Sequence, residues 1–217
     1  MDEKTTMTKN NEKSQLAEKR HREILDAARH IFAEKGYRVT TIDDIANYLT
    51  VGKGTIYRYF ANKEALFIAV FEDGMEQLMT TMYSHIEAVV NPADKIRCAI
   101  GTFFEFFDEN PELVEIGMQV RSEFKDDYRR IFLEVYSDYI VKIQETIRAG
   151  INTGVFRNLD VEKTSEAFSA MLHGVLQDFY VREFGPDGGI AKKELLTDKI
   201  DAVTSLLMEG LLERGNK

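Results

Sequence analysis

Hydrophobic residues recur every three or four positions along most of the chain, which is the spacing of an amphipathic α-helix. No segment has the alternation of apolar and polar positions that is typical of a half-buried strand. Helix-ending signals separate the periodic segments at Gly36, at Asn91 with Pro92, at Pro111 and at Gly154. The pattern therefore predicts an all-α protein.

Two short helical patterns joined by a tight connection lie between Thr40 and Phe60. Thr40 and Asp43 have the spacing of a capping box, which would begin the first of these helices. After Gly52, the second pattern turns its larger side chains inward and leaves a small, hydroxylated, aromatic and basic face outward. The inward residues are Ile56, Tyr59 and Phe60, the outward ones are Gly54, Thr55 and Arg58, and Lys53 and Tyr57 lie along the edge. Such a face can approach a nucleic acid closely and donate to phosphate oxygens and base edges.

Three runs of sequence carry a family resemblance: ILDAARHIFAEKGY, TTIDDIANYL and GTIYRYFANKEALF, in this order between Ile24 and Phe67. Together they resemble the DNA-binding domain of the TetR (TetR/AcrR) transcriptional regulators. Two positions depart from the family pattern, because Thr50 stands where glycine is usual and Gly52 where serine is frequent. Threonine is unfavourable at positive φ, and Gly52 offers no side-chain oxygen as a cap, so the turn can be shaped differently.

The resemblance implies an N-terminal three-helix DNA-binding domain with a helix-turn-helix, followed by a C-terminal helical bundle for ligand binding and dimerisation. We expect a disordered polar tail over residues 1–14, the DNA-binding domain over 15–61 and the bundle over 62–217. The inner face of the first helix would carry Leu16, Ile24, Ala27, Ala28, Ile31 and Phe32. A long helix of about 28 residues, capped by Asn62 and ending near Val90, would connect the two domains over about 40 Å.

The second half of the chain predicts further helices that begin at Pro92 and Pro111, run from about Lys125 to Thr153, and begin again after Asp160. A polar loop at 185–189 leads to a last helix between Leu195 and Leu212. Each of the final two helices carries apolar residues on more than one side, which is more than the core of one subunit needs to bury. In the resembling family this pair forms the dimer interface, for which the candidate residues are Val175, Phe179, Val203, Leu206 and Leu207.

The formal net charge of −9 argues against a nucleic-acid partner until the chain is divided. Residues 1–63 hold 12 basic and 9 acidic residues, a net charge of +3, and the remainder holds 16 and 28, a net charge of −12. A basic DNA-binding part on an acidic body fits this asymmetry, and so does an ordinary solvated acidic surface.

The remaining chemistry is sparse. Cys98 is the single cysteine, which excludes an internal disulfide and a multi-thiolate zinc site, and we interpret it as a packing residue with redox sensing as the alternative. No pair of histidines has metal-ligand spacing, and there is no phosphate-binding loop or nucleophile motif, so we expect no metal, no cofactor and no enzyme. His173 is interpreted as a core or interface histidine. No leader or membrane-length apolar segment is present, and we expect a cytoplasmic protein.

The resemblance to the TetR regulators implies a ligand-responsive, homodimeric regulator that represses from a palindromic double-stranded operator and is released by a small hydrophobic or acyl effector. The alternative is a helical ligand-binding or protein-interaction module that does not act on DNA. By position in the family, the DNA contacts would be Thr40, Thr41, Lys53, Gly54, Thr55, Tyr57, Arg58, Tyr59 and Lys63. The candidate effector residues are Phe103, Phe107, Met118, Arg121, Tyr136, Tyr139, Phe168 and Met171.

Overall fold

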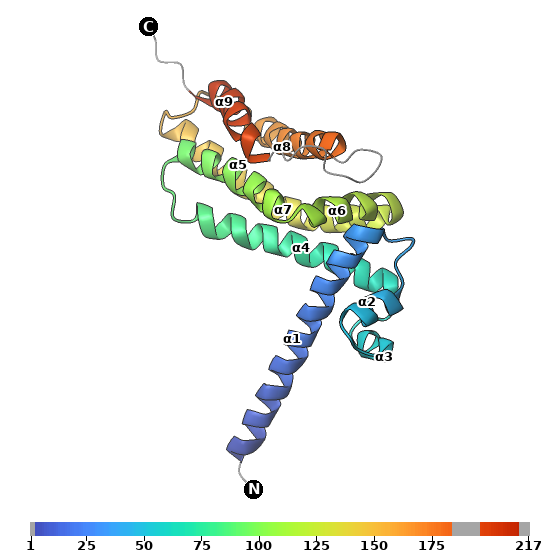
Figure 1. Ribbon diagram of the computed structural model, residues 1–217. Coiled ribbons are helices and arrows are strands. Elements are labelled where there is room, and N and C mark those ends of the chain that lie inside the picture. The colour runs from blue at the N-terminus through green and yellow to red at the C-terminus, as the bar shows by residue number, and fades with distance from the viewer. Residues whose placement is uncertain (1–2, 184–195, 213–217) are drawn as a thin grey trace. The chain divides into compact units, whose positions relative to one another are not determined.

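A computed structural model describes residues 3–183 and 196–212 of the chain (Figure 1). The helices are α1 (Glu3–Lys35), α2 (Ile42–Tyr48), α3 (Lys53–Tyr57), α4 (Lys63–Ile86), α5 (Pro92–Glu109), α6 (Pro111–Glu123), α7 (Lys125–Asn152), α8 (Val161–Glu183) and α9 (Ile200–Leu211), with a 3₁₀ turn η1 (Leu196–Lys199) before the last. Over these residues no strand is formed, and the sole β-type contact is an isolated bridge between Phe156 and Leu212. The prediction of an all-α protein is confirmed.

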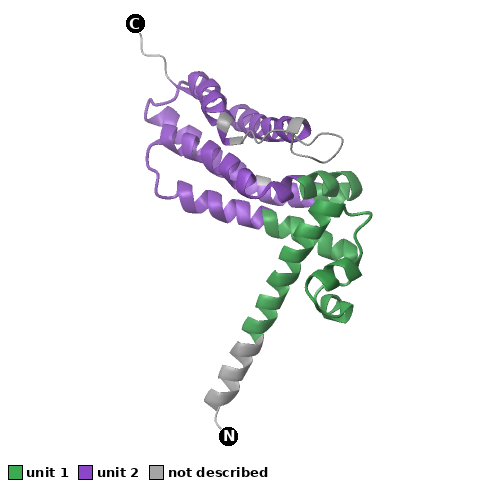
Figure 2. Cartoon of the chain, viewed as in Figure 1, with its two compact units in different colours: residues 1–74, 115–128 green, residues 75–114, 129–217 purple. Residues whose placement is uncertain are grey.

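The chain divides into two compact units (Figure 2). Unit 1 comprises residues 1–74 and 115–128, and unit 2 comprises residues 75–114 and 129–217. Helices α4, α6 and α7 each belong partly to one unit and partly to the other. Most of α6 thus packs with the N-terminal helices, although its sequence position is far from theirs.

The core of unit 1 forms where the apolar faces of its short helices meet. Ile24, Phe32, Ile45, Ile56 and Phe67 are all buried, as the periodic pattern predicts. Aromatic rings continue this core: Phe32, Phe67 and Phe124 surround Tyr37 with ring centroids 4.7–6.1 Å away. The short helices α2 and α3 are too short to be stable alone, and this shared core holds them in place.

The N-terminal end of α1 differs from expectation in two ways. The helix already begins at Glu3, where a disordered tail is expected, and Leu16 is exposed rather than on the inner face. The tail contains no proline or glycine. Extending an existing helix costs little per residue, so the helix can continue toward the N-terminus beyond the exposed Leu16.

The ends of the longer helices follow local signals in most cases. The amide of Ala65 donates to the side chain of Asn62 at 2.7 Å and the amide of Lys163 to that of Asp160 at 3.1 Å, which confirms both predicted caps. Gly36 and Gly154 have φ of 83° and 70°, as helix-ending glycines require. Helix α4 ends at Ile86 rather than near Val90. Asn91 caps the next helix, and the β-branched residues Val89 and Val90 lie between the two helices.

The core of unit 2 is built around α5, which packs against α8, η1 and α9. It buries Ile100, Phe104 and Phe107 of α5 with Phe168 and Leu172 of α8. Helix α8 ends at Glu183, and the predicted loop at 185–189 lies outside the described residues. The last helix is shorter than predicted, because the 3₁₀ turn precedes it.

Candidate nucleic-acid interface and ligand cavity

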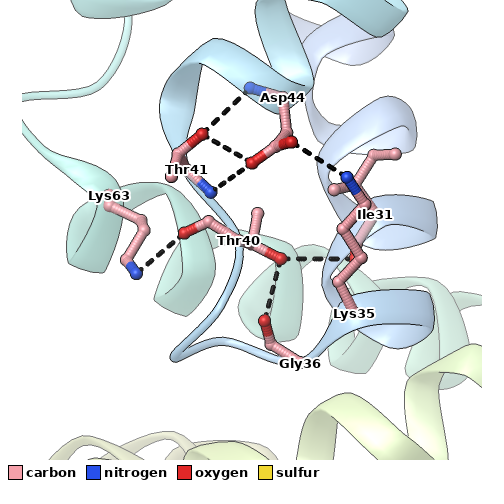
Figure 3. Close-up of polar contacts among 7 residues, drawn as sticks. All are labelled: Ile31, Lys35, Gly36, Thr40, Thr41, Asp44 and Lys63. Atoms are coloured by element: carbon pink, nitrogen blue, oxygen red, sulfur yellow. Dashed lines mark hydrogen bonds and ion pairs between the residues drawn. The ribbon is translucent and has the colours of Figure 1, made fainter.

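The first short helix of the candidate interface is capped one residue later than predicted (Figure 3). The hydroxyl of Thr41 accepts from the amide of Asp44 at 3.2 Å, and the Asp44 carboxylate accepts from the amide of Thr41 at 2.8 Å. This reciprocal pair is the capping box. The predicted pair, Thr40 with Asp43, has the same residue types shifted by one position, so composition alone did not distinguish them.

Thr40 is buried instead, with 1% of its surface exposed. Its hydroxyl donates to the carbonyl of Gly36 at 2.8 Å and lies 3.4 Å from the carbonyl of Ile31 (Figure 3). The carbonyl of Gly36 lies just after the last residue of α1, where helices leave acceptors without intrahelical partners. Thr40 therefore closes the turn between α1 and α2 and lies outside the exposed surface that DNA could contact.

Lys63 also has internal partners. Its ammonium donates to the carbonyls of Tyr37 and Thr40 at 2.8 and 2.9 Å, and it lies 4.3 Å from the centre of the Tyr37 ring. An ammonium has three donors, so two of the three hold the α1–α2 turn against the start of α4. The geometry assigns Lys63 a positioning role in addition to any contact with phosphate.

The turn between α2 and α3 is formed by the two residues that depart from the family pattern. Thr50 has φ of 55°, and among the described residues it is the one non-glycine with positive φ. The amide of Val51 donates to the carbonyl of Ala46 at 2.9 Å and ends α2. Gly52 caps α3 with φ −75° and ψ 144°. As predicted, it makes no side-chain hydrogen bond, because glycine has no side-chain oxygen. The turn therefore accommodates a strained threonine where glycine would be relaxed.

Helix α3 presents the predicted outward face. Ile56 and Phe60 are buried and anchor the helix, whereas its other side is open to solvent. Thr41, Lys53, Gly54, Tyr57 and Arg58 are exposed, and Thr55 and Tyr59 are half-buried. The side chain of Lys53 lies 3.5 Å from Asp43, and both are mostly exposed, so this ion pair is weak and can open toward a phosphate.

Sequence reasoning missed an aromatic residue beside this face. Tyr48, at the end of α2, is 57% exposed, and its ring centroid lies 5.5 Å from that of His30. The helical repeat gave no signal for it, because Tyr48 lies three residues after the buried Ile45 and therefore on the same face of the repeat.

One carboxylate in the interface is strongly perturbed. The hydrogen bond from the Thr41 hydroxyl, followed by that from the Lys35 ammonium, holds the pKa of Asp44 far below its usual range. Lys35 lies 2.9 Å from Asp44 and joins the end of α1 to the start of α2. The carboxylate thus remains charged at neutral pH, at the N-terminal end of a helix, where negative charge is favourable.

Unit 2 contains a cavity of about 610 Å³. It is bounded by the end of α4, the start of α5 and the C-terminal half of α7. The apolar part of the lining comes chiefly from Met82, Ile86, Ile96, Ala99, Ile143 and Ala149. The charged lining residues are Glu87, Lys95, Lys142 and Glu145, with Tyr139 and Thr146 as further polar groups. This arrangement, mostly apolar with a few polar groups, is typical of small-molecule sites.

The predicted effector residues do not form one site. Tyr139 lines the cavity, but Phe103, Phe107 and Phe168 pack into the core of unit 2. Met118 and Arg121 belong to unit 1, and Met171 is partly exposed on α8. Tyr136 lies in α7, and its side chain is outside the described part of the structure. The aromatic candidates were predicted as effector contacts from their residue type. Those that are buried in the core already fill the space that a ligand would need. Sequence reasoning missed the smaller lining residues Ala99 and Ala149.

His173 packs in the core of unit 2, between the edges of Phe103 and Phe132 at centroid distances of 5.5 Å. Its Nδ1 lies 2.9 Å from the carbonyl of Ser169, so this nitrogen carries the proton and donates. Burial lowers the pKa of His173, which keeps the ring neutral at physiological pH. In the described residues no three His, Cys, Asp or Glu side chains are grouped to hold a metal ion, and no helix there could span a membrane.

The candidate dimer residues differ in exposure. Val203 is buried in the core of unit 2, whereas Val175, Phe179 and Leu207 are half-buried. Leu206 is 68% exposed, and Val181 on α8 is also exposed. Val203 is therefore a core residue of the single chain, since its position in the helix faces α5 rather than solvent.

Comparison with known proteins identifies the family. The family model "Bacterial regulatory proteins, tetR family" matches residues 24–70, and "Tetracyclin repressor-like, C-terminal domain" matches residues 89–211, more than half of the chain. The chain belongs to the TetR family. This TetR-family protein is accordingly a DNA-binding transcriptional regulator, and the alternative of a module that does not act on DNA is not supported.

Similar proteins include regulators of fatty acid metabolism. The TetR-family chain is 27% identical over 143 residues to the fatty acid metabolism regulator protein of Bacillus subtilis, a match that covers 65% of this chain and 74% of that protein. It is similar to the solved fatty acid degradation regulator FadR of Bacillus halodurans, with 25% identity, a TM-score of 0.75 and coverage of 90% and 97%. FadR from Bacillus subtilis in complex with stearoyl-CoA has 26% identity, a TM-score of 0.70 and coverage of 87% and 97%.

Proposed function

We propose that this TetR-family regulator is a repressor that binds a twofold operator as a homodimer and leaves it when a small hydrophobic effector of the acyl type binds. The exposed face of α3 carries this proposal. Lys53, Tyr57 and Arg58 are exposed together on a helix whose opposite side is anchored by buried Ile56. Lys53 and Tyr57 are suited to phosphate oxygens, and Arg58 can reach base edges in the major groove.

Twofold DNA recognition requires two copies of this face. A pair of recognition helices engages half-sites about 34 Å apart, one turn of DNA, and a symmetric dimer provides that pair. The exposed apolar residues Val181 and Leu206 lie on α8 and α9, and half-buried Val175, Phe179 and Leu207 accompany them. Their exposure in the single chain supports a dimer through these two helices.

The cavity of unit 2 is the proposed effector site. Its volume of about 610 Å³ lies in the range of small-molecule pockets, about 300–1,000 Å³. The FadR complex with stearoyl-CoA supports a ligand with an acyl chain. Met82 and Ile86 line the cavity from α4, and the same helix begins in the DNA-binding unit. A ligand that moves α4, and so binds a DNA-competent and a DNA-incompetent arrangement of the protein unequally, would therefore change operator affinity.

The test is titration of operator DNA, taken from upstream of the protein's own coding sequence, at several salt concentrations. We expect a salt-sensitive complex that Tyr57→Ala weakens on every operator sequence, whereas Arg58→Ala chiefly reduces the preference among sequences. An acyl ligand should release the DNA, and saturating operator should weaken ligand binding by the same factor. Absence of a salt-sensitive complex would contradict the DNA-binding surface, and equal ligand affinity with and without operator would contradict the proposed induction.

A further inference from the structure

We propose that the effector of this regulator carries one carboxylate beside its hydrophobic part, and that Lys95 binds this carboxylate at the cavity of unit 2. The inference rests on the proposed function, in which this cavity holds the effector. It adds the charge of the ligand and the residue that selects it.

The four charged residues of the lining are not equivalent. Lys142 is paired, with its Nζ 3.1 Å from a carboxylate oxygen of Glu145, and both side chains are more than half exposed. Glu87 is exposed to solvent, which screens its charge. Lys95 is half-buried, and its ammonium has no ion-pair or hydrogen-bond partner among the described residues. Among the described lining residues it is the less exposed of the two lysines and the one without a counter-charge.

An ammonium without an ion-pair partner at an apolar cavity can make charge-assisted hydrogen bonds to an anionic ligand, and these are stronger than hydrogen bonds to a neutral ligand. The helix start beside it does not offer an alternative anion site. The side chain of Asn91 already accepts from the amides of Ala93 and Asp94 at 2.8 and 3.3 Å. At the start of α5, the positive charge for an anion therefore comes from Lys95.

The charge balance of the cavity favours one negative charge over several. A coenzyme A thioester brings three phosphate groups, each with at least one negative charge. The lining has two lysines and two glutamates, and one of the lysines is already paired. The chain beyond residue 63 is also strongly acidic, which repels a polyanion. A single carboxylate matches the one lysine of the lining that has no ion-pair partner among the described residues.

The test compares decanoate, decanol and decanoyl-CoA on the full-length protein, by calorimetry and by release of operator DNA. The three ligands share one chain length and differ in the charge of the head group. We expect decanoate to bind about tenfold or more tightly than decanol, as a charge-assisted hydrogen bond predicts, and more tightly than decanoyl-CoA. Lys95→Gln should remove the preference for decanoate over decanol, and Lys95→Arg should retain it.

Arg97→Gln is the matched control, because it removes an exposed cation of the same helix that does not line the cavity. It should leave the preference intact. Equal binding of acid and alcohol by the unaltered protein, or an unchanged preference in Lys95→Gln, would overturn the proposal and leave the effector site in place. Tighter, Lys95-dependent binding of decanoyl-CoA would overturn the carboxylate and assign the anion to phosphate. If none of the three binds or releases DNA, the acyl effector itself is wrong.

Discussion

The side-chain amide oxygen of Gln119 accepts a hydrogen bond from the backbone amide of Tyr37 at 2.7 Å, although 82 residues separate them. The amide nitrogen of the same side chain, Nε2, donates to the carboxylate of Glu115 at 2.6 Å and lies 3.5 Å from the carbonyl of Phe32. Arg38 adds an ion pair to Glu123 at 2.8 Å. Helix α6 thus holds the turn that precedes the helix-turn-helix. Like α4 and α7, it belongs partly to this DNA-binding unit and partly to unit 2.

Gln119→Ala should lower the free energy of unfolding by about 1–2 kcal/mol, because the half-buried amide of Tyr37 would lose its partner. Arg38→Gln is the control, since it breaks an ion pair between the same two segments. That pair is largely exposed on the arginine side, so its loss should cost about 0.5 kcal/mol or less. Urea unfolding measures both. Equal effects of the two variants would show that Gln119 does not hold the turn.

Lys63 and Lys53 should behave differently, although both are candidate DNA contacts. Lys63→Met should lower the free energy of unfolding by about 1–3 kcal/mol, because two backbone carbonyls lose a charged donor. Lys53→Ala should leave stability nearly unchanged and reduce the slope of log affinity against log salt by about 1. Urea unfolding and operator titration over a salt series distinguish them. A stable Lys63→Met variant would contradict the positioning role.

The Asp44 cap should make stability depend on pH in the acid range. The pKa of Asp44 is depressed in the folded protein, so its contribution is present above the ordinary aspartate pKa of about 3.9 and is lost as the pH falls toward the folded value. Asp44→Asn should therefore melt at a lower temperature than the unaltered protein at pH 6. The gap should narrow below about pH 4. Thermal melts from pH 6 to pH 2.5 measure this gap, and a gap that stays constant with pH would contradict the assignment.

Thr50→Gly should stabilise the protein by about 0.5–1 kcal/mol. The left-handed conformation costs a residue with a side chain about 1–2 kcal/mol, and glycine loses about 0.5–1 kcal/mol through the greater entropy of its unfolded state. Thr153→Gly is the matched control, because Thr153 also follows a helix but lacks positive φ, and its hydroxyl donates to Ala149 at 2.8 Å. It should be destabilising. Loss of stability in Thr50→Gly would mean that the threonine is held there by contacts that outweigh the strain.

Leu206→Glu should weaken the proposed dimer at least about tenfold without unfolding the chain, since a charge would be buried in an apolar interface. Leu133→Glu serves as the control, because Leu133 is 51% exposed on α7, outside the proposed interface. Sedimentation at micromolar concentration measures the association. A monomeric unaltered protein would refute the dimer.

The sequence by itself determined the features that depend on neighbours along the chain. Helical periodicity places Ile24, Ile45 and Ile56 in the core and turns Lys53 and Arg58 outward, because i, i+3 and i+4 positions share one face wherever the helix packs. The caps at Asn62 and Asp160 were likewise predictable, since a cap binds amides two or three residues away.

Tertiary structure decided where contacts join distant segments. Thr40 and Thr41 are adjacent residues of the same type, so the sequence does not distinguish them. The end of α1 packs against Thr40 and buries it, which leaves Thr41 to cap α2. The partner of Gln119 is 82 residues away, and the cavity lies among α4, α5 and α7 rather than at the aromatic residues of α5. Local sequence specifies which face of each helix is apolar. It does not specify how closely those faces approach one another, and that distance determines whether an apolar residue fills a core or lines a cavity.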